Sequence, residues 1–278
     1  APRWSSSRSS LSQLISLTQR SVSQEYLAKL VYSMKSELSS GLIEEQPMTV
    51  QEYRQTRFTP PEGATEILLV RHGESRAARA DAPFPLVDGQ GDPELAPQGR
   101  VQAEQVGQRL QSLPIGAVYV TKLQRTTETA APLCRAIGLQ PNQNPDLHEV
   151  HLGDWEGGVL RIKAHENHPI YQQMQAEGRW DVIPGAESAE AFKTRLLRGI
   201  HTIAAAHPDE LVAVFVHGGV IGQILEVITG ARSFAFTGAD NGSISHIVVQ
   251  GDAIILRRFN DTAHLIDQDP LAAAALPT

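Results

Sequence analysis

Short apolar runs alternate with amphipathic stretches along most of this chain. The runs have the length of buried strands and occupy residues 66–70, 117–121, 211–216, 243–250 and 253–259. Between them, apolar residues recur three or four positions apart, which predicts helices over residues 98–113, 125–137, 188–206 and 218–229. This alternation predicts an α/β sandwich. Because Gly251-Asp252 joins the last two strands as a tight hairpin, we expect an antiparallel edge in a mixed sheet.

The first part of the chain differs in composition from the rest. It is rich in serine and has no acidic residue before Glu25, while its apolar residues mostly follow helical spacing from Leu11 onward. Enrichment in arginine and serine resembles an organellar transit peptide, whereas Met48 is an alternative native start. We therefore predict four segments, namely a partly helical or disordered extension at 1–48, a linker at 49–65, the main domain at 66–265 and a tail at 266–278.

The composition is that of an ordinary globular protein. The 278 residues are 41% hydrophobic and 20% charged, and no apolar run approaches the roughly 18 residues of a membrane span. A formal net charge of -7 at pH 7 argues against a general binder of nucleic acid or acidic membranes. We expect a cytoplasmic protein, with an N-terminal targeting segment as the alternative, and a possible homodimer. The lone Cys134 occupies an apolar helical position, which predicts a core residue.

Two of the predicted strands end in a histidine followed by glycine. One buried run leads into Arg71-His72-Gly73, and a second, far downstream, leads into His217-Gly218-Gly219. Gly73 permits an unusual turn whose backbone carbonyl could accept the N–H of one nitrogen of the His72 ring. The other ring nitrogen would then be free to attack an electrophile, so His72 is a candidate nucleophile.

Three positions beside these strand ends could bind an anion. Arg71 directly precedes the candidate nucleophile. Arg125 follows another strand and opens a helix, where its guanidinium and the helix amides can face the same anion. His217 and its glycines form a third junction from strand to helix. Such groups gathered around one nucleophile indicate a phosphoryl-transfer site.

Several motifs carry a family resemblance, and they occur in the family's order. They are Arg71-His72-Gly73, residues 95–103, residues 123–130, Leu147-His148-Glu149 with residues 153–157, residues 184–188 and Val216-His217-Gly218-Gly219. In this combination the chain resembles the histidine phosphatase superfamily, in its phosphoglycerate-mutase-like group, over about residues 66–265. The resemblance implies a three-layer α/β sandwich in which helices flank a central mixed, mostly parallel sheet.

The same resemblance implies roles for the principal residues. His72 would attack phosphorus and become phosphorylated, while Arg71, Arg125 and His217 would bind the phosphoryl oxygens and stabilise the transition state. Glu149 would be the general acid. An alkoxide is a poor leaving group, so a carboxyl group that stays protonated near the pocket must donate a proton as the ester bond breaks.

Neighbouring residues have secondary roles in this interpretation. The backbone N–H of Gly218 is an extra donor to phosphate. Ser75 supports the turn after the nucleophile, with a direct phosphate contact as the alternative. Glu74 and Glu156 are the alternatives to Glu149 as the acid.

No metal and no other cofactor is expected. The arginines supply the positive charge, and the two His-x-x-His spacings lack a third nearby ligand. Those spacings are formed by His148, His151, His165 and His168.

One position departs from the family pattern. Members often carry asparagine five residues after the glycine of Arg-His-Gly, and here that residue is Ala78. Arg76 or Arg79 could replace the lost contact. A loop rich in proline and glycine follows at residues 81–93, and we expect substrate selection to depend on it and on residues 160–183.

Together these features predict a metal-independent phosphatase that hydrolyses the phosphate monoester of a small molecule through a phosphohistidine on His72. The alternative enzyme is a cofactor-dependent phosphoglycerate mutase. The short span between Arg125 and Glu149 argues against it, because such mutases carry a long insertion in this region. A module that binds a phosphorylated ligand without catalysis is the third possibility. It would be expected to have lost His72 or Glu149, and both are present.

Overall fold

The computed structural model describes residues 24–39 and 52–265. Contacts divide the chain into two units, Ala1–Arg57 and Phe58–Thr278. In the first unit, helix α1 (Gln24–Ser39) covers the later part of the stretch in which helical spacing begins at Leu11. The rest of that stretch and the expected C-terminal tail lie outside the described residues.

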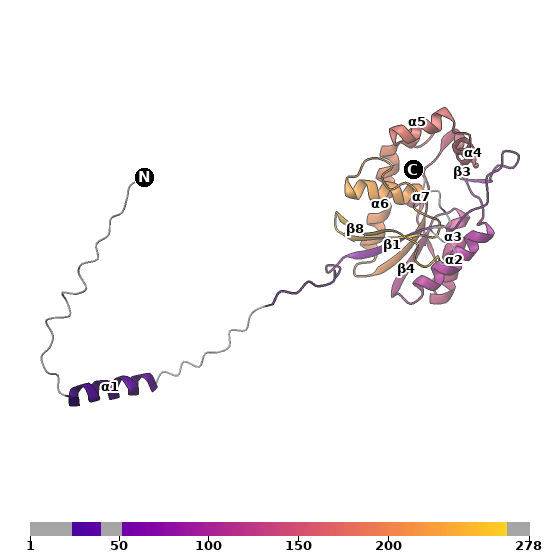
Figure 1. Ribbon diagram of the computed structural model, residues 1–278. Coiled ribbons are helices and arrows are strands. Elements are labelled where there is room, and N and C mark those ends of the chain that lie inside the picture. Colours follow the sequence, from indigo (N-terminus) through magenta and orange to yellow (C-terminus); the bar gives the residue numbers. More distant parts are fainter. Residues whose placement is uncertain (1–23, 40–51, 266–278) are drawn as a thin grey trace, which may run out of the picture. The chain divides into compact units, whose positions relative to one another are not determined.

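The second unit is built on a six-stranded sheet with the order β5-β4-β6-β1-β7-β8 (Figure 1). Strands β5, β4, β6 and β1 run parallel, and β7 and β8 add an antiparallel edge. The strands are β1 (Thr65–Arg71), β4 (Ile115–Val120), β5 (Asn142–Gln143), β6 (Leu211–Val216), β7 (Ile244–Gln250) and β8 (Ala253–Asp261). A separate small hairpin consists of β2 (Leu86–Val87) and β3 (Gln90–Gly91).

Helices cover both faces of this sheet. The long ones are α2 (Pro97–Leu110), α3 (Gln124–Ile137), α6 (Ala189–Ala206) and α7 (Gly218–Thr229). The short ones are α4 (Val159–His165), α5 (Pro169–Glu177) and the 3-10 turns η1 (Pro145–Leu147), η2 (Gly153–Trp155) and η3 (Trp180–Val182). None of the helices in the described parts of the chain is long and apolar enough to cross a membrane.

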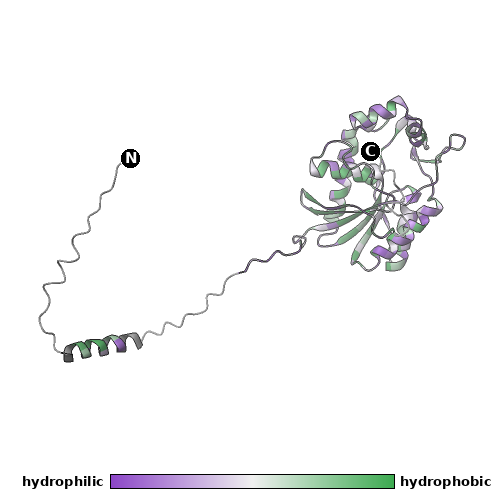
Figure 2. Ribbon diagram, viewed as in Figure 1, coloured by the Kyte–Doolittle hydropathy of each residue, from purple (hydrophilic) through white to green (hydrophobic). Residues whose placement is uncertain are grey.

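The two-residue period of the central strands explains the layers. In β1, Ile67 and Leu69 pack with residues of α6 and α7, whereas Leu68 and Val70 pack with residues of α2 and α3. Strand β6 alternates in the same way, so both central strands are buried on both faces. Figure 2 shows the hydrophobic residues concentrated along these strands. The predicted three-layer sandwich is confirmed.

The predicted elements agree with the observed ones apart from their ends. Each of the five predicted strands is present with bounds that differ by at most two residues, and the hairpin at Gly251-Asp252 joins two antiparallel strands. Cys134 is buried against the α2–α3 side of the sheet, as predicted. Helix α2 ends at Leu110, before the predicted end at residue 113. The pattern did not indicate β2, β3 and β5, because two-residue strands are too short to show a period.

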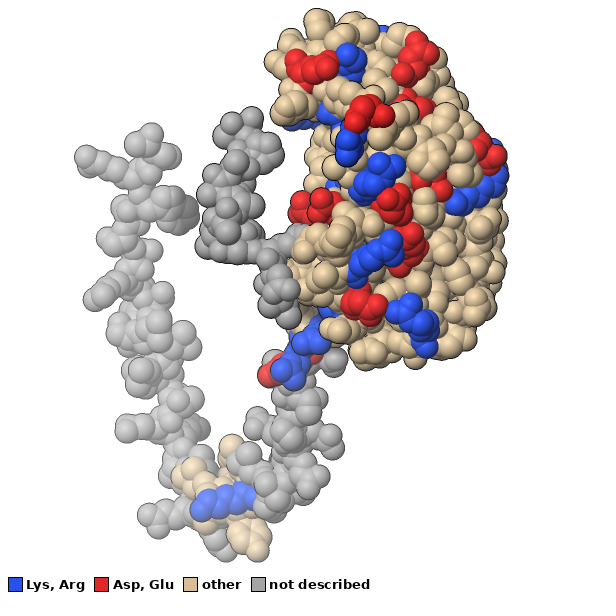
Figure 3. Space-filling view, turned by 90° about the vertical axis from the view of Figure 1, so that its right-hand side faces the viewer, with Lys and Arg blue, Asp and Glu red and all other residues tan. Residues whose placement is uncertain are grey.

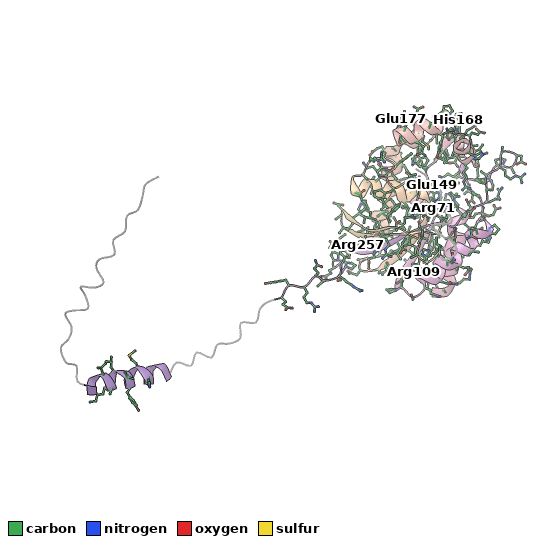
Figure 4. The ribbon with its side chains drawn as sticks, in the orientation of Figure 1. Arg71, Arg109, Glu149, His168, Glu177 and Arg257 are labelled. Carbon is green, nitrogen blue, oxygen red and sulfur yellow. The ribbon has the colours of Figure 1, made fainter. Side chains whose placement is uncertain are left out.

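A small third cluster of apolar residues lies beyond the sandwich. Buried Trp155, Met174 and Ile183 are its centre, and residues from η2, α4, α5 and η3 complete it. These elements form the cap, which we define as residues 153–183. In Figure 4, His168 and Glu177 mark the two ends of α5 in the cap, and Arg71 and Glu149 lie nearer the sheet.

Candidate active site

The candidate site is a cavity at the carboxyl ends of the central parallel strands. Strand β1 ends in Arg71, and β6 leads through His217 into α7. Because β1 and β6 are adjacent and parallel, these two strand ends lie together. The cavity contains Arg71, His72, Arg125 and Glu149, together with residues of the cap. Open α/β sheets commonly bind their ligands at this edge.

His72 is held in one tautomer, which leaves the lone pair on Nε2. Its Nδ1 lies 2.7 Å from the backbone oxygen of Gly73, which only accepts hydrogen bonds, so Nδ1 carries the proton. Its Nε2 then has a lone pair, 3.2 Å from the donating Nε of Arg125. Burial lowers the pKa of His72 well below its usual value, and the charges of Arg125 and Arg71 lower it further. His72 is therefore a neutral imidazole with an available nucleophilic nitrogen.

The turn that carries His72 depends on close contact with α2. A Cβ atom added to Gly73 would lie 2.4 Å from the backbone oxygen of Gly99. A Cβ atom added to Gly99 would lie 2.0 Å from the backbone oxygen of Glu74. Neither position has room for a side chain. This contact accounts for the glycine in the motif at residues 95–103.

Two arginines approach the nucleophile from different elements. Arg125, at the start of α3, is 7% exposed and donates from NH1 to the backbone oxygen of Gly91 at 3.0 Å. Burial lowers the pKa of Arg125 to about 10, so its guanidinium remains charged at neutral pH. Arg71 donates from NH1 to the backbone oxygen of Ala239, while its buried Nε has no partner among the described residues. Both side chains keep donor groups at the site.

His217 lies behind the cavity surface rather than on it. It is fully buried, its ring centroid is 5.3 Å from that of His72, and its Nε2 is 3.0 Å from the hydroxyl of Thr121. Its Nδ1 has no hydrogen-bond partner in the described part of the chain. Burial lowers the pKa of His217 well below its usual value, and Arg125 and His72 lower it further. Gly218, the next residue, does line the cavity.

Glu149 has the environment of a proton donor. Its Oε1 accepts from the backbone N–H of Val150 at 3.0 Å, and its Oε2 accepts from that of Gly219 at 3.1 Å. Burial raises the pKa of the carboxyl group above its usual value, against the opposing effect of these N–H groups and of Arg125 and Arg71. A carboxyl group with a raised pKa keeps its proton at a higher pH.

The two alternative acids occupy different places. Glu156 also lines the cavity, and, like Glu149, it accepts a backbone N–H on each oxygen, here from Gly91 and Leu152 at 2.8 Å. Glu74 lies in a neighbouring hollow and not in the cavity with His72. Glu149 shares the cavity with His72 and has a carboxyl group whose pKa is raised by burial.

Ser75 does not line the cavity that contains His72. Its buried hydroxyl accepts a 2.7 Å hydrogen bond from the guanidinium of Arg161. Arg76 or Arg79 could have replaced the missing asparagine, but neither lines the cavity; they pair with Glu94 and Asp81, respectively. Arg161, on α4, lines it instead. Sequence reasoning placed Arg161 in the expected substrate region but gave it no role.

Three of the four histidines in the His-x-x-His spacings use a ring nitrogen as a local acceptor. His148, His151 and His168 accept from the backbone N–H groups of Lys122, Gly153 and Ile170, respectively. Among the described residues, no group of three or more His, Cys, Asp or Glu side chains could hold a metal ion.

The charged residues outside the site do not form a single-sign surface on the face shown in Figure 3. Lys and Arg side chains there are interspersed with Asp and Glu. Within the cavity, by contrast, Arg71, Arg125 and Arg161 bring positive charge together.

Solved structures with the same fold include enzymes of two kinds. A mycobacterial glucosyl-3-phosphoglycerate phosphatase is 24% identical, with a TM-score of 0.60 over 72% of this chain and 100% of that one. A phosphoglycerate mutase from Bacillus anthracis is 22% identical, with a TM-score of 0.62 over 74% of this chain and 96% of that one. At these identities the likeness establishes the fold.

Sequence relatives are more similar. "Phosphoglycerate mutase-like protein 4" of Arabidopsis thaliana is 36% identical over 167 residues, which are 58% of this chain and 70% of the relative. "Metal-independent phosphoserine phosphatase" of the same plant is 29% identical over 205 residues, 72% of this chain and 83% of the relative. The sequence profile of the histidine phosphatase superfamily (branch 1) matches residues 67–262. The family resemblance in the motifs is thereby confirmed, and the chain belongs to the histidine phosphatase superfamily.

Proposed function

We propose that this protein hydrolyses the phosphate monoester of a small molecule through a phosphohistidine on His72, without a metal ion. One observation carries the proposal: a neutral imidazole, with its proton fixed on Nδ1, shares a cavity with Arg71, Arg125 and the high-pKa carboxyl group of Glu149. The cavity thus holds a nucleophile, cations for a phosphoryl group and a proton donor together.

In the first step the lone pair of His72 Nε2 attacks phosphorus. The N–P bond forms and the ester P–O bond breaks, while the leaving oxygen takes the proton of Glu149. The ring becomes cationic, and the carbonyl oxygen of Gly73 stabilises it by accepting the Nδ1 proton in a hydrogen bond. Arg71 and Arg125 neutralise the charge that develops on the phosphoryl oxygens.

In the second step the carboxylate of Glu149 takes a proton from water as the water oxygen attacks phosphorus. The N–P bond breaks, and its electron pair returns to Nε2 of His72. Inorganic phosphate leaves, and both residues regain their initial protonation states. The same residue thus acts first as acid and then as base.

The relatives support hydrolysis or phosphoryl transfer as the reaction class. One is named a phosphoserine phosphatase that is independent of metal, and the more identical one is named mutase-like. A mutase is therefore the second candidate. It would return the phosphoryl group to a second hydroxyl in place of water, would interconvert 2- and 3-phosphoglycerate, and would depend on a bisphosphate primer.

Release of p-nitrophenol from p-nitrophenyl phosphate in the presence of EDTA tests the proposal. We expect turnover by the native protein and its loss in His72→Ala. The control His201→Ala changes a histidine of α6 outside the cavity and should behave as native. No release by the native protein, or equal release by His72→Ala, would exclude this mechanism. A release screen over sugar phosphates, phosphoglycerates, nucleotides and phosphoamino acids would then identify the substrate.

A further inference from the structure

Arg161 brings a third guanidinium to the cavity. Its NH2 donates to the hydroxyl of Ser75 at 2.7 Å, and its NH1 donates to the backbone oxygen of Arg76 at 3.0 Å. A guanidinium has five N–H donors, so these two bonds fix its position and leave three N–H groups for a ligand. The ring of Phe84 supports it, 5.4 Å from the guanidinium carbon.

The positive charge of Arg161 has no paired carboxylate. Among the described residues, no carboxylate oxygen lies within ion-pair distance of its guanidinium. Arg76 lies against the same Phe84 ring, but it pairs with Glu94 at 3.0 Å. Arg161 is exposed as a whole residue, but the partial burial of its guanidinium lowers its pKa, while Glu74 raises it from farther away. An unpaired cation that lines a cavity is suited to bind an anion from solution.

Arg161 makes no hydrogen bond to the group that surrounds the nucleophile, although its positive charge is near enough to help lower the pKa of His72 and of Arg71. Its two hydrogen bonds go to residues 75–76 and none goes to a group bonded to His72, whereas Arg125 contacts the nucleophile directly. It also faces the neighbouring hollow that contains Ser75 and Ala78. Arg161 thus borders the cavity that contains His72 and, because it lies on α4, belongs to the cap.

Four apolar side chains form part of the lining of the cavity that Arg161 shares with Glu149, and we call them the apolar wall. It contains Phe84, Trp155, Leu160 and Trp180, all of which line the cavity. When phosphate is bound at His72, the leaving group of the ester would occupy the remainder of the cavity that these side chains help to line. Apolar carbon atoms of the leaving group would gain burial there.

From these contacts we infer that the substrate carries a carboxylate on the part of the molecule that leaves, and that Arg161 binds it. The inference rests on the proposed phosphatase function. The substrate class is the phosphate monoester of a hydroxy acid whose carbon skeleton packs against the apolar wall. Arg161 is thus a specificity residue, and Ser75, through its hydroxyl, is the positioning residue that holds it.

Matched esters test this inference. Phenyl phosphate and its 3- and 4-carboxyphenyl counterparts share the phosphate and the ring, and they differ in the carboxylate. Arg161→Gln should lower kcat/KM on both kinds of ester or on the carboxylated ones alone. The fall on the carboxylated ester that the native protein prefers should exceed the fall on phenyl phosphate by a factor of about ten or more, since charge-assisted hydrogen bonds to the carboxylate are lost. Comparing each variant with native on the same ester cancels differences in leaving-group reactivity.

Arg76→Gln is the matched control, because Arg76 stacks on the same Phe84 ring without lining the cavity. It should change the three esters equally. An equal loss on phenyl phosphate and the carboxylated esters in Arg161→Gln would overturn the inference, since Arg161 would then act on the phosphoryl group or on folding.

Binding of stable analogues separates this inference from the proposed function. Benzylphosphonate and 4-carboxybenzylphosphonate can be titrated calorimetrically whether or not the protein turns over esters. We expect the carboxylated analogue to bind more tightly to the native protein, and Arg161→Gln to remove that advantage. Equal binding of both analogues by the native protein would overturn the inference even if phosphatase activity is found.

Discussion

The guanidinium of Arg195 donates a 2.8 Å hydrogen bond to the backbone oxygen of Glu149. The same side chain donates to the backbone oxygens of Asp146 and His148 at 2.8 and 2.7 Å, and forms two 2.8 Å bonds to the carboxylate of Glu187. One arginine of α6 therefore fixes the whole segment that carries the acid. Because the Arg195 and Glu187 side chains are 17% and 16% exposed, this ion pair is shielded from solvent.

Arg195→Met should impair proton donation by Glu149 more than nucleophilic attack. An alkoxide needs the proton of the acid, whereas p-nitrophenolate leaves readily without it. We expect kcat/KM to fall about tenfold or more on an alkyl phosphate and clearly less on p-nitrophenyl phosphate. Steady-state kinetics on both esters measure the difference.

Arg198→Met is the control for Arg195→Met. Arg198 lies on the same helix and pairs with Asp146, but its side chain is 60% exposed and it does not contact Glu149. It should leave both activities near native. If Arg195→Met lowers the two activities by the same factor, its role is general folding and not placement of the acid.

The sequence was informative where chemistry is tied to strand ends. His72 and His217 each follow a buried strand. Because the two strands are parallel neighbours, their carboxyl ends lie together, and the sequence pattern alone was enough to predict this. Arg125 was found for the same reason. Glu149 has a weaker local signal, since its loop carries no regular period, and the family motif identified it.

Arg161 and Arg195 could not be assigned from the sequence. Both lie on helices, where an arginine is normally solvated, and their roles depend on tertiary contacts with loops distant in sequence. Arg161 reaches Ser75, 86 positions away, and Arg195 reaches Glu149, 46 positions away. Helical spacing predicts the face of a residue but not its partner.

Glu149→Gln should separate the two chemical steps. With p-nitrophenyl phosphate the first step needs little acid, so His72 becomes phosphorylated, but no carboxylate then activates water. We expect acid-labile phosphohistidine to accumulate in the variant and not in the native protein, as measured by mass spectrometry at neutral pH. The exposed Glu190→Gln should resemble native. Native turnover of an alkyl phosphate by Glu149→Gln would move the acid role to another residue.

Gly99→Ala should displace the nucleophile. The added Cβ would meet the backbone oxygen of Glu74 at 2.0 Å, and backbone atoms cannot move aside without shifting the turn that holds His72. We expect kcat to fall at least about tenfold and the unfolding free energy to fall by about 1–3 kcal/mol, as in other overpacked sites. Gln98→Ala, at the exposed neighbouring position, is the control for both measurements. A native kcat in Gly99→Ala would show that the turn has more freedom than its contacts suggest.

Protonation of half-buried His148 and of buried His72 and His217 should lower the stability of the fold below neutral pH. Burial lowers the pKa of His148 to about 4 from its usual 6.5, so between these values the unfolded chain binds a proton that the folded protein does not. Its contribution to stability is full above pH 6.5 and is lost as pH falls toward 4. The pKa values of His72 and His217 are lowered in the same way, whereas the raised pKa of Glu149 has the opposite effect on stability.

Urea unfolding from pH 7.5 to 5 measures the effect of His148. The unfolding free energy of the native protein should fall more steeply with decreasing pH than that of His148→Asn, and the two slopes should differ by up to about one bound proton. Parallel curves for the two proteins would mean that folding does not lower the pKa of His148.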